Sequence, residues 1–290
     1  MADRRELPTD PSILKTLTLG DLVRRYRDNV TGKKRTAENE TIIVNAFLKH
    51  SICKKKLSTL TTMDFARYQE ERLQHVKPQS VNRELNPIRH MFRIAQSEWD
   101  IPIDNLLANS RFKKCDVRRE RRLREGEWEL LMEQGRSCRK PIVHSVVQFA
   151  LETAMRRGEI LNLKWEHLNR RDSSLLIPIT KNGHSRIIPM TDKAWSILDV
   201  VEQADERVFP LTKNVLAHVW IEITNQAGIE DLHFHDLRHE AISRLFEKGL
   251  TTPEVALISG HRDMKMLFRY AHAQRSQIIS KLKKFEDIKK

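Results

Sequence analysis

The sequence predicts a mainly α-helical protein of two domains with one small β-hairpin or sheet. Apolar residues recur at helical spacing through most of the 290 residues. Two short apolar runs, at 175–179 and 186–190, flank an Asn-Gly dipeptide, which is typical of a hairpin turn. Eight of the fourteen residues in 111–124 are basic, which favours an extended linker over a packed element. We therefore predict a helical domain at 18–110 and a second domain at 125–290.

Charge and composition restrict the function before any motif does. Lys and Arg outnumber Asp and Glu by 52 to 39, and the net charge of +13 favours a polyanionic partner, above all nucleic acid. No apolar run approaches the ~20 residues of a membrane-spanning helix, and the N-terminal tail, 1–17, carries acidic residues where a secretory leader would be apolar. Three cysteines without metal-type spacing predict reduced thiols. We expect a cytoplasmic, nucleoid-associated protein with no membrane partner.

Four helices are predicted in the first domain. The first begins at Thr18, a candidate N-cap, and the second begins near Ala37. The third covers 61–73 and opens with a threonine followed by an acidic residue. The fourth covers 80–99, and we expect it to bend or break at Pro87, because proline removes a backbone donor and its ring collides with the preceding turn. The basic residues left outside form either a solvated face or a nucleic-acid surface.

The second domain is predicted to be helical outside its hairpin. Lys181 lies in the hairpin loop. Gly249 follows the third of four predicted helices, which cover 192–203, 212–227, 235–248 and 253–259. A last helix at 276–290 has apolar residues at helical spacing, and it could dock on its own domain or on a neighbouring protomer.

The pentapeptide HDLRH, at 235–239, is the first candidate for chemistry. His235 and Arg238 are three residues apart, so a helix would present both to one ligand, and a guanidinium matches two phosphate oxygens. His235 and His239 also have the spacing of a zinc helix, but Asp236 stands where a zincin has its glutamate, and Arg238 would repel a cation. A third interpretation is that these groups only satisfy buried carbonyls.

Other candidate residues occur in a fixed order along the second domain. Arg156 and Glu159 are three apart near a helix start, so the carboxylate could hold the guanidinium in one rotamer. The two could equally form an ordinary surface pair contributing ~0.3 to 0.5 kcal/mol. Lys181 comes next, and His261 and Tyr270 follow the HDLRH segment, nine residues apart.

These segments together resemble the tyrosine recombinase family, also called the phage integrase family. TAMRRGEI resembles the family's first arginine box, TKNGHSRIIPM its lysine hairpin, HDLRH its second box, and SGHRDMKMLFRYAH its histidine-and-nucleophile box. Ala154 stands where glycine is commoner in the family. The resemblance covers 125–290, and the domain at 18–110 is similar to the family's SAM-like core-binding domain.

The resemblance implies a site-specific DNA recombinase that cleaves and rejoins duplex DNA through a 3′-phosphotyrosine, whether for integration, excision or resolution. It implies that Tyr270 is the nucleophile, that Arg156 and Arg238 bind the scissile phosphate, and that Lys181 protonates the leaving 5′-oxygen. The surrounding cations predict a lowered pKa for the Tyr270 phenol.

The remaining roles follow from the same resemblance. It implies that His235 moves a proton to or from the nucleophile and that His261 donates a hydrogen bond to the phosphate. Glu159 and His239 are expected to support the residues that touch the phosphate. Because the energy of the broken linkage is kept in the phosphotyrosine, and because arginines neutralise the phosphate, we expect no nucleotide, no metal and no other cofactor.

The expected partners are also implied by the resemblance. They are double-stranded DNA with a specific recombination site, further copies of the chain in a tetramer on two sites, and accessory DNA-bending proteins. We expect the two domains to close as a clamp about DNA, with affinity falling steeply as salt rises. We assign DNA contacts to the basic residues Arg118, Arg119, Arg121, Arg122, Arg83 and Lys77.

Three other functions stay open from the sequence. A type IB topoisomerase has similar chemistry but relaxes supercoils as a monomer. A non-catalytic DNA-binding regulator on the same fold would need no nucleophile. A metal-dependent phosphohydrolase would lose its activity to a strong chelator.

Overall fold

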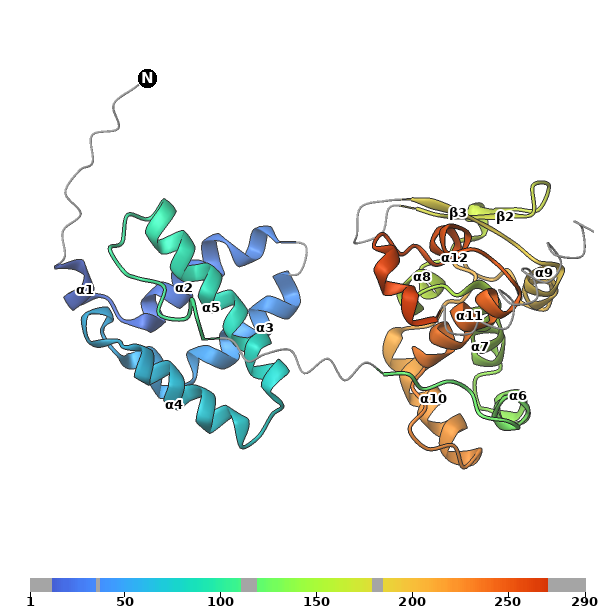
Figure 1. Cartoon of the computed structure of the whole chain (residues 1–290), viewed down its shortest axis with the longest axis horizontal. Coiled ribbons are helices and arrows are strands. Elements are labelled where there is room, and N and C mark those ends of the chain that lie inside the picture. Colours follow the sequence, from blue (N-terminus) through green and yellow to red (C-terminus); the bar gives the residue numbers. More distant parts are fainter. Residues whose placement is uncertain (1–11, 35–36, 111–118, 179–184, 271–290) are drawn as a thin grey trace, which may run out of the picture. The chain divides into compact units, whose positions relative to one another are not determined.

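The computed structural model divides the chain into two compact units, the N-terminal unit (Met1–Val117) and the C-terminal unit (Arg118–Lys290). Figure 1 shows that both are mostly helical, with the strands β2 and β3 in the C-terminal unit. The boundary after Val117 falls inside the segment predicted as a linker. The structure describes residues 12–34, 37–110, 119–178 and 185–270.

The N-terminal unit is a bundle of helices. Its elements are α1 (Ile13–Thr16), α2 (Leu19–Asn29), η1 (Thr31–Lys33), α3 (Ala37–Leu48), η2 (Ser51–Lys54), η3 (Leu57–Thr59), α4 (Thr62–Leu73) and α5 (Pro78–Glu98). The predicted N-cap at Thr18 is confirmed, since its hydroxyl accepts a hydrogen bond from the Asp21 amide at 3.2 Å while the Asp21 carboxylate accepts one from the Thr18 amide at 2.9 Å. Thr61 and Asp64 form the same capping box before α4.

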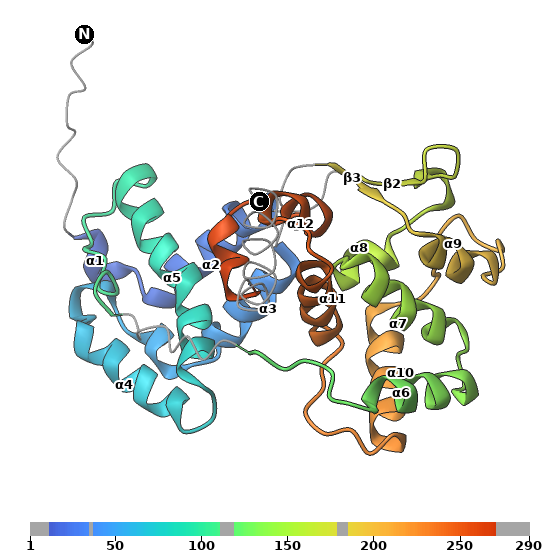
Figure 2. The ribbon, with the colours of Figure 1, turned by 45° about the vertical axis from the view of Figure 1, so that its right-hand side comes forward.

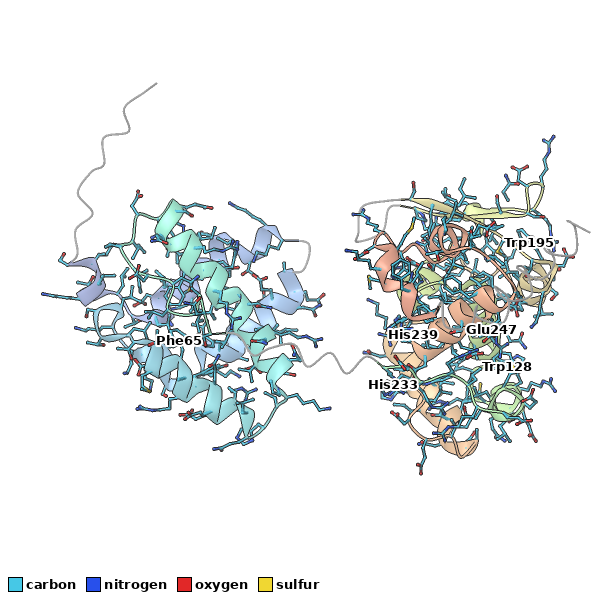
Figure 3. All side chains as sticks on the ribbon, in the orientation of Figure 1. Phe65, Trp128, Trp195, His233, His239 and Glu247 are labelled. Carbon is cyan, nitrogen blue, oxygen red and sulfur yellow. The ribbon has the colours of Figure 1, made fainter. Side chains whose placement is uncertain are left out.

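Aromatic side chains fill the core of this bundle. Phe65 of α4, labelled in Figure 3, meets Phe92 of α5 edge to face, with ring centroids 5.8 Å apart. Helix α5 continues through Pro87, so the expected break is absent and that part of the prediction is wrong. The physical reason is packing, because Leu85 and Ile88, on either side of Pro87, are both fully buried and hold the helix against the core.

The C-terminal unit combines helices with a three-stranded antiparallel sheet of order β1-β2-β3. Its elements are α6 (Glu127–Ser137), α7 (Ile142–Thr153), α8 (Arg157–Leu161), η4 (Trp165–His167), β1 (Leu168–Asn169), β2 (Ser174–Ile177), β3 (Arg186–Pro189), α9 (Asp192–Asp199), α10 (Lys213–Gln226), α11 (Asp236–Glu247), α12 (Thr252–Ser259) and η5 (Met264–Met266). Leu175 pairs with Ile188, so the predicted pairing of the two apolar runs is confirmed.

Helices α7 and α11 pack against each other inside the C-terminal unit, and α12 packs against both α11 and β3. Figures 1 and 2 show α12 between the sheet and α11. Gly249 has a positive φ of 92° just beyond α11, as expected for a glycine that ends a helix. The hairpin turn at 182–183 and the expected helix at 276–290 lie outside the described residues.

The described cysteines are free thiols. Cys53 and Cys138 are both buried and unpaired by disulfides, and burial raises the pKa of the Cys53 thiol to about 12. A thiol with so high a pKa is unreactive at neutral pH. Within the described part of the chain, no helix combines the length and the apolar character needed to cross a membrane.

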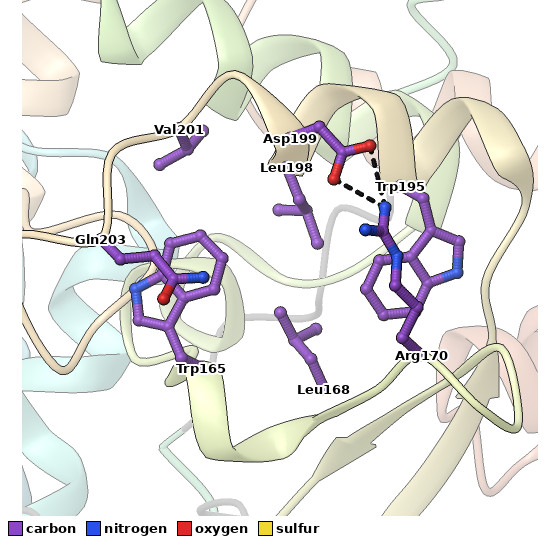
Figure 4. Close-up of a pocket in the computed structure, with 8 residues that line it drawn as sticks. All are labelled: Trp165, Leu168, Arg170, Trp195, Leu198, Asp199, Val201 and Gln203. Atoms are coloured by element: carbon purple, nitrogen blue, oxygen red, sulfur yellow. Dashed lines mark hydrogen bonds and ion pairs between the residues drawn. The ribbon is translucent and has the colours of Figure 1, made fainter.

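A cavity of about 430 Å³ opens between α9 and the η4–β1 segment, as Figure 4 shows. Arg170 lies 5.1 Å above the Trp195 ring at its rim and forms an ion pair with Asp199 at 2.6 Å. The residues that line it are Trp165, Leu168, Arg170, Trp195, Leu198, Asp199, Val201 and Gln203. Since this lining includes no residue predicted to act in catalysis, the cavity is separate from the candidate site.

Candidate active site

Arg156 is positioned by the start of α8. Helix α7 ends at Thr153, and Ala154 follows with a left-handed φ of 52°, the backbone region that favours glycine. The Arg156 amide then donates to Glu159 Oε2 at 2.9 Å, and Arg156 Nη1 donates to Glu159 Oε1 at 2.8 Å. The Glu159 side chain is only 7% exposed, so this is a buried contact rather than an ordinary surface pair.

Arg238 is placed by α11 in the interior of the unit and is 4% exposed. Its Nη1 donates to the Ala154 carbonyl at 2.5 Å and its Nη2 to the Ser259 carbonyl at 2.6 Å, so it does satisfy buried carbonyls. Burial, and then the charge of Arg156, lower the pKa of Arg238 to about 9. The guanidinium therefore keeps its charge at neutral pH.

The two arginines meet at the C-terminal end of α12. Arg156 Nη2 donates to the Gly260 carbonyl at 3.1 Å, next to the Ser259 carbonyl that binds Arg238. The last carbonyls of a helix carry partial negative charge, so this end attracts cations. Two side chains more than eighty residues apart are thereby brought to one place, directly before His261.

His261 is neutral in this arrangement. The Ser259 hydroxyl donates its single proton to the Val255 carbonyl at 2.6 Å, so His261 Nδ1, 2.7 Å from that hydroxyl, must be the donor. Burial, followed by the charges of Arg238 and Arg156, lowers the pKa of His261 to about 4. Nε2 therefore carries a lone pair, and the predicted donation to a phosphate requires this nitrogen to take up a proton.

His235 and His239 lie one turn apart at the start of α11, with ring centroids 5.1 Å apart. Burial is the main cause that lowers both pKa values, to about 4 for His239, so both rings are neutral at pH 7. The described residues contain no group of three or more His, Cys, Asp or Glu side chains placed to hold a metal ion.

The Tyr270 hydroxyl is held by His239 and Arg269. Arg269 Nη2 donates to His239 Nδ1 at 2.8 Å and to the phenol oxygen at 2.5 Å, while the phenol contacts the same His239 Nδ1. Because Arg269 donates to Nδ1, that nitrogen is an acceptor, and the phenol donates to it. The ring of Tyr270 is stacked on those of His239 and Phe246.

The predicted lowering of the Tyr270 pKa is wrong for this structure. The residue is 8% exposed, and burial raises the pKa of the phenol although Arg269 and Arg238 act in the opposite direction. The phenol opens onto a pocket of about 400 Å³. Arg119, Glu120, Arg122, His239, Ser243, Glu247, Arg269 and Tyr270 line it, and Figure 3 labels His239 and Glu247 on α11.

The contacts thus join the predicted site residues into two groups. Arg156, Arg238 and His261 converge at the end of α12. The phenol of Tyr270 binds His239, the residue after Arg238. Glu159 supports Arg156 as expected, and Lys181 lies outside the described residues.

Three of the arginines expected to lie along DNA phosphates bind carboxylates in this structure. Arg119 donates to both carboxylate oxygens of Asp236, at 2.8 and 2.9 Å from its Nε. Arg121 pairs with Glu127 at 2.5 Å, and Arg122 with Glu240 at 2.9 Å. Each of these arginines is thus paired with a carboxylate, and Arg122 is still 41% exposed. Of the other assigned contacts, Arg118 is outside the described residues, whereas Arg83 and Lys77 are exposed.

Two arginines that the sequence analysis did not single out also belong to the site. Arg186, the first residue of β3, binds both oxygens of Glu159. Arg269 binds Tyr270 and His239. A signal for Arg186 was available, because a basic residue begins an otherwise apolar strand directly after the hairpin loop.

Comparison with known proteins shows what this chain is similar to. The sequence pattern of the phage integrase family matches residues 121–277. The chain is 37% identical over 279 residues to the shufflon-specific DNA recombinase of Escherichia coli, and the alignment covers 93% of this chain and 72% of that protein. It is 25% identical to the tyrosine recombinase XerD of Vibrio cholerae over 69% of this chain and 72% of that protein. A lambda integrase dimer bound to a COC′ core site has the same fold, with a TM-score of 0.75 and 21% identity over 92% of this chain and 81% of that one.

Proposed function

The chain belongs to the phage integrase family, and from this premise we propose how it acts as a site-specific tyrosine recombinase that cleaves and rejoins duplex DNA. The observation that carries the proposal is the convergence of Arg156 and Arg238 on the adjacent carbonyls of Gly260 and Ser259. Two fixed guanidiniums beside His261 form a site for one phosphate group, within the same unit as a buried phenol.

The two arginines would stabilise the transition state. Negative charge accumulates on the non-bridging oxygens as the phosphate is attacked, and donors fixed in advance need no reorganisation at that moment. One such donor is worth ~2.7 to 4 kcal/mol in acyl-transfer sites. The carbonyl contacts of Arg156 and Arg238 supply that fixed position.

The covalent step exchanges one phosphate ester for another. The oxygen of Tyr270 bonds to phosphorus, the bond from phosphorus to the 5′-oxygen breaks, and a 3′-phosphotyrosine remains. The phenol loses a proton and the 5′-oxygen gains one. We assign Lys181 as the donor to the 5′-oxygen and His235 as the carrier of the proton of the nucleophile, which in the resting structure is donated to His239, one turn from His235. The reverse step, with a 5′-hydroxyl of another strand, releases Tyr270 and completes strand exchange.

Assembly is part of the same proposal. We assign double-stranded DNA with a specific recombination site as substrate, and four protomers on two such sites as the active assembly, helped by DNA-bending proteins. One solved structure of the same fold is a lambda integrase tetramer bound to a Holliday junction. A protein with this substrate would act on chromosomal DNA in the cytoplasm.

The nucleophile is tested by the Tyr270→Phe substitution. The protein is incubated with DNA fragments that carry a suspected site, covalent adducts are trapped in denaturant, and the modified residue is mapped. We expect an adduct at Tyr270 in the wild type, none in the variant, and equal DNA binding by both, because phenylalanine keeps the ring that packs on Phe246. An adduct that persists in the variant, or maps to another residue, contradicts the assignment.

Assays with the same protein and DNA distinguish recombination from the other three candidate functions. Recombination requires two paired sites on one plasmid, whereas a topoisomerase would relax a plasmid with none. We expect adduct formation to continue in the presence of a strong chelator. A metal-dependent phosphohydrolase would lose its activity under the same conditions. A regulator without catalysis would form no adduct at all.

A further inference from the structure

Arg186 joins three elements of the C-terminal unit through one guanidinium. It begins β3, and its Nη1 and Nη2 donate to Glu159 Oε1 and Oε2 of α8 at 3.1 and 2.7 Å. Its Nε donates to the Ile258 carbonyl of α12 at 3.1 Å. The side chain is 12% exposed, so these bonds form away from most solvent. Among the side chains of proteins, only the planar guanidinium of arginine can donate all three of these hydrogen bonds at once.

The carboxylate that Arg186 binds is also the one that orients Arg156. Glu159 accepts from Arg156 Nη1 at 2.8 Å and from its amide at 2.9 Å. Hydrogen bonds from Arg186 and Arg156 hold the pKa of Glu159 at about 2 despite its burial. The carboxylate is therefore ionised throughout the working range of pH and is shared by two guanidiniums.

Arg186 also packs against the second anchor of Arg156. Gly260 has a left-handed φ of 69°, and a Cβ placed there would lie 2.7 Å from Arg186 Nη1 and 2.8 Å from its Cζ. The Gly260 carbonyl accepts from Arg156 Nη2. Both groups that fix the Arg156 guanidinium, the Glu159 carboxylate and the Gly260 peptide, are thus in direct contact with Arg186.

The charge balance of this cluster gives Arg186 a further role. Arg156 and Glu159 alone would form a neutral pair, which attracts a phosphate weakly. With Arg186 the three side chains carry a net charge of +1, so the charge of Arg156 is left for an anion. Loss of Arg186 would leave a buried carboxylate that competes with the phosphate for Arg156.

We propose that Arg186 is a positioning residue for strand cleavage, which orients Arg156 through Glu159 and Gly260 and neutralises Glu159 so that Arg156 can hold the scissile phosphate. This inference rests on the proposed function of the site. It also connects β3, whose first residue lies five positions after Lys181 in the sequence, to Arg156.

The test compares single and double variants in the full-length protein. Cleavage is measured as the rate of adduct formation at saturating DNA, and DNA affinity and melting temperature are measured separately. For Arg186→Gln we expect cleavage to be about 100-fold slower, the effect of losing one transition-state donor, because Arg156 is no longer held in position. We expect DNA affinity to be nearly unchanged. Arg186→Lys keeps the charge without the fork, so we expect an intermediate rate.

The decisive variant is Arg186→Gln combined with Glu159→Gln. It removes the uncompensated carboxylate, so we expect faster cleavage than in Arg186→Gln alone, although the double variant has fewer hydrogen bonds. A merely structural role predicts the opposite, because the second substitution would only loosen the site further. Arg170→Gln, at the ion pair with Asp199 beside the separate cavity, is the matched control and should leave the cleavage rate unchanged.

Two outcomes would overturn the inference. One is wild-type cleavage by Arg186→Gln, and the other is a double variant no faster than that single variant. If the wild type forms an adduct at Tyr270 while either result is found, the inference about Arg186 alone fails. If the wild type forms no adduct with any DNA that carries a site, the proposed function fails and this inference fails with it.

Discussion

The Tyr270 phenol lies among cations, with Arg269 bound to its hydroxyl and the charge of Arg238 acting on it. A prediction from charge alone therefore gave a lowered pKa. The structure shows a raised one, because burial penalises the phenolate more than these charges favour it. At the scale of the residue, desolvation decides the resting state, and the proposed nucleophile is a neutral phenol that donates to His239.

This leads to a prediction for all three tyrosines of the chain. Burial is the first cause that raises the pKa of Tyr26, Tyr68 and Tyr270 above the ordinary value of 10.0. In an alkaline titration followed by phenolate absorbance, we expect no tyrosine to ionise near pH 10 while the protein stays folded.

The sign of the effect on stability follows from the same shift. A raised pKa in the folded state means that the contribution of these phenols is fully present below the pKa of the unfolded chain and is lost as pH rises beyond it. We expect phenolate absorbance and unfolding to appear together in the alkaline range. A phenol that ionises near pH 10 in the folded wild type, and is missing in Tyr270→Phe, would contradict the raised pKa of Tyr270.

At the scale of the element, the C-terminal end of α12 organises the site. Its last carbonyls bind Arg238 and Arg186, and Gly260, which caps the helix in a left-handed conformation, binds Arg156. Three guanidiniums around one helix end agree with the negative pole of the helix dipole. The helix therefore acts as a scaffold for the cations of the proposed phosphate site.

The glycine at this helix end provides a second prediction. Gly260→Ala introduces a Cβ 2.7 Å from Arg186 in a left-handed conformation, so we expect a loss of roughly 1 to 3 kcal/mol of unfolding free energy. Gly158→Ala is the control, since its Cβ meets nothing within 4 Å and alanine in a helix is favoured by about 0.5 to 1 kcal/mol. Denaturant unfolding of both variants gives the comparison. Equal stability of the two would show that Gly260 is not confined as described.

At the scale of the whole molecule, the count of 52 basic residues overstates the number of unpaired cations. Arg119, Arg121 and Arg122 each bind a carboxylate of the C-terminal unit. These pairs attach the segment after residue 118 to α6 and α11. The basic residues therefore include arginines that bind carboxylates of the fold, among which Arg122 is still exposed, and arginines such as Arg83 that lie exposed on the N-terminal unit.

Salt dependence should separate these two classes. Each phosphate contact that is lost lowers the slope of log affinity against log salt by about 1, so we expect Arg83→Gln to reduce the slope for duplex DNA. Arg121→Gln should leave the slope unchanged but lower the unfolding free energy by about 3 kcal/mol, because it leaves Glu127, a 10% exposed carboxylate, without its partner. A reversed pattern would mean that Arg121 contacts DNA and that Arg83 does not.

The sequence by itself determined the local features of this protein. Thr18 and Thr61 marked helix starts correctly, because a capping box is made by residues three apart. Two apolar runs around an Asn-Gly dipeptide predicted the pairing of β2 with β3, and the ordered boxes identified the family that the comparisons show. Each of these signals is local or depends only on the order of segments along the chain.

Tertiary structure decided which distant groups meet and which are removed from water. Arg186 binds a carboxylate 27 residues away, and Arg119 binds one 117 residues away, and no spacing rule selects such partners. Packing keeps α5 helical through Pro87, and burial raises the pKa of Tyr270, which was expected to be lowered. The physical reason is common to all four, because desolvation and long-range pairing depend on neighbours in space, which a linear pattern does not specify.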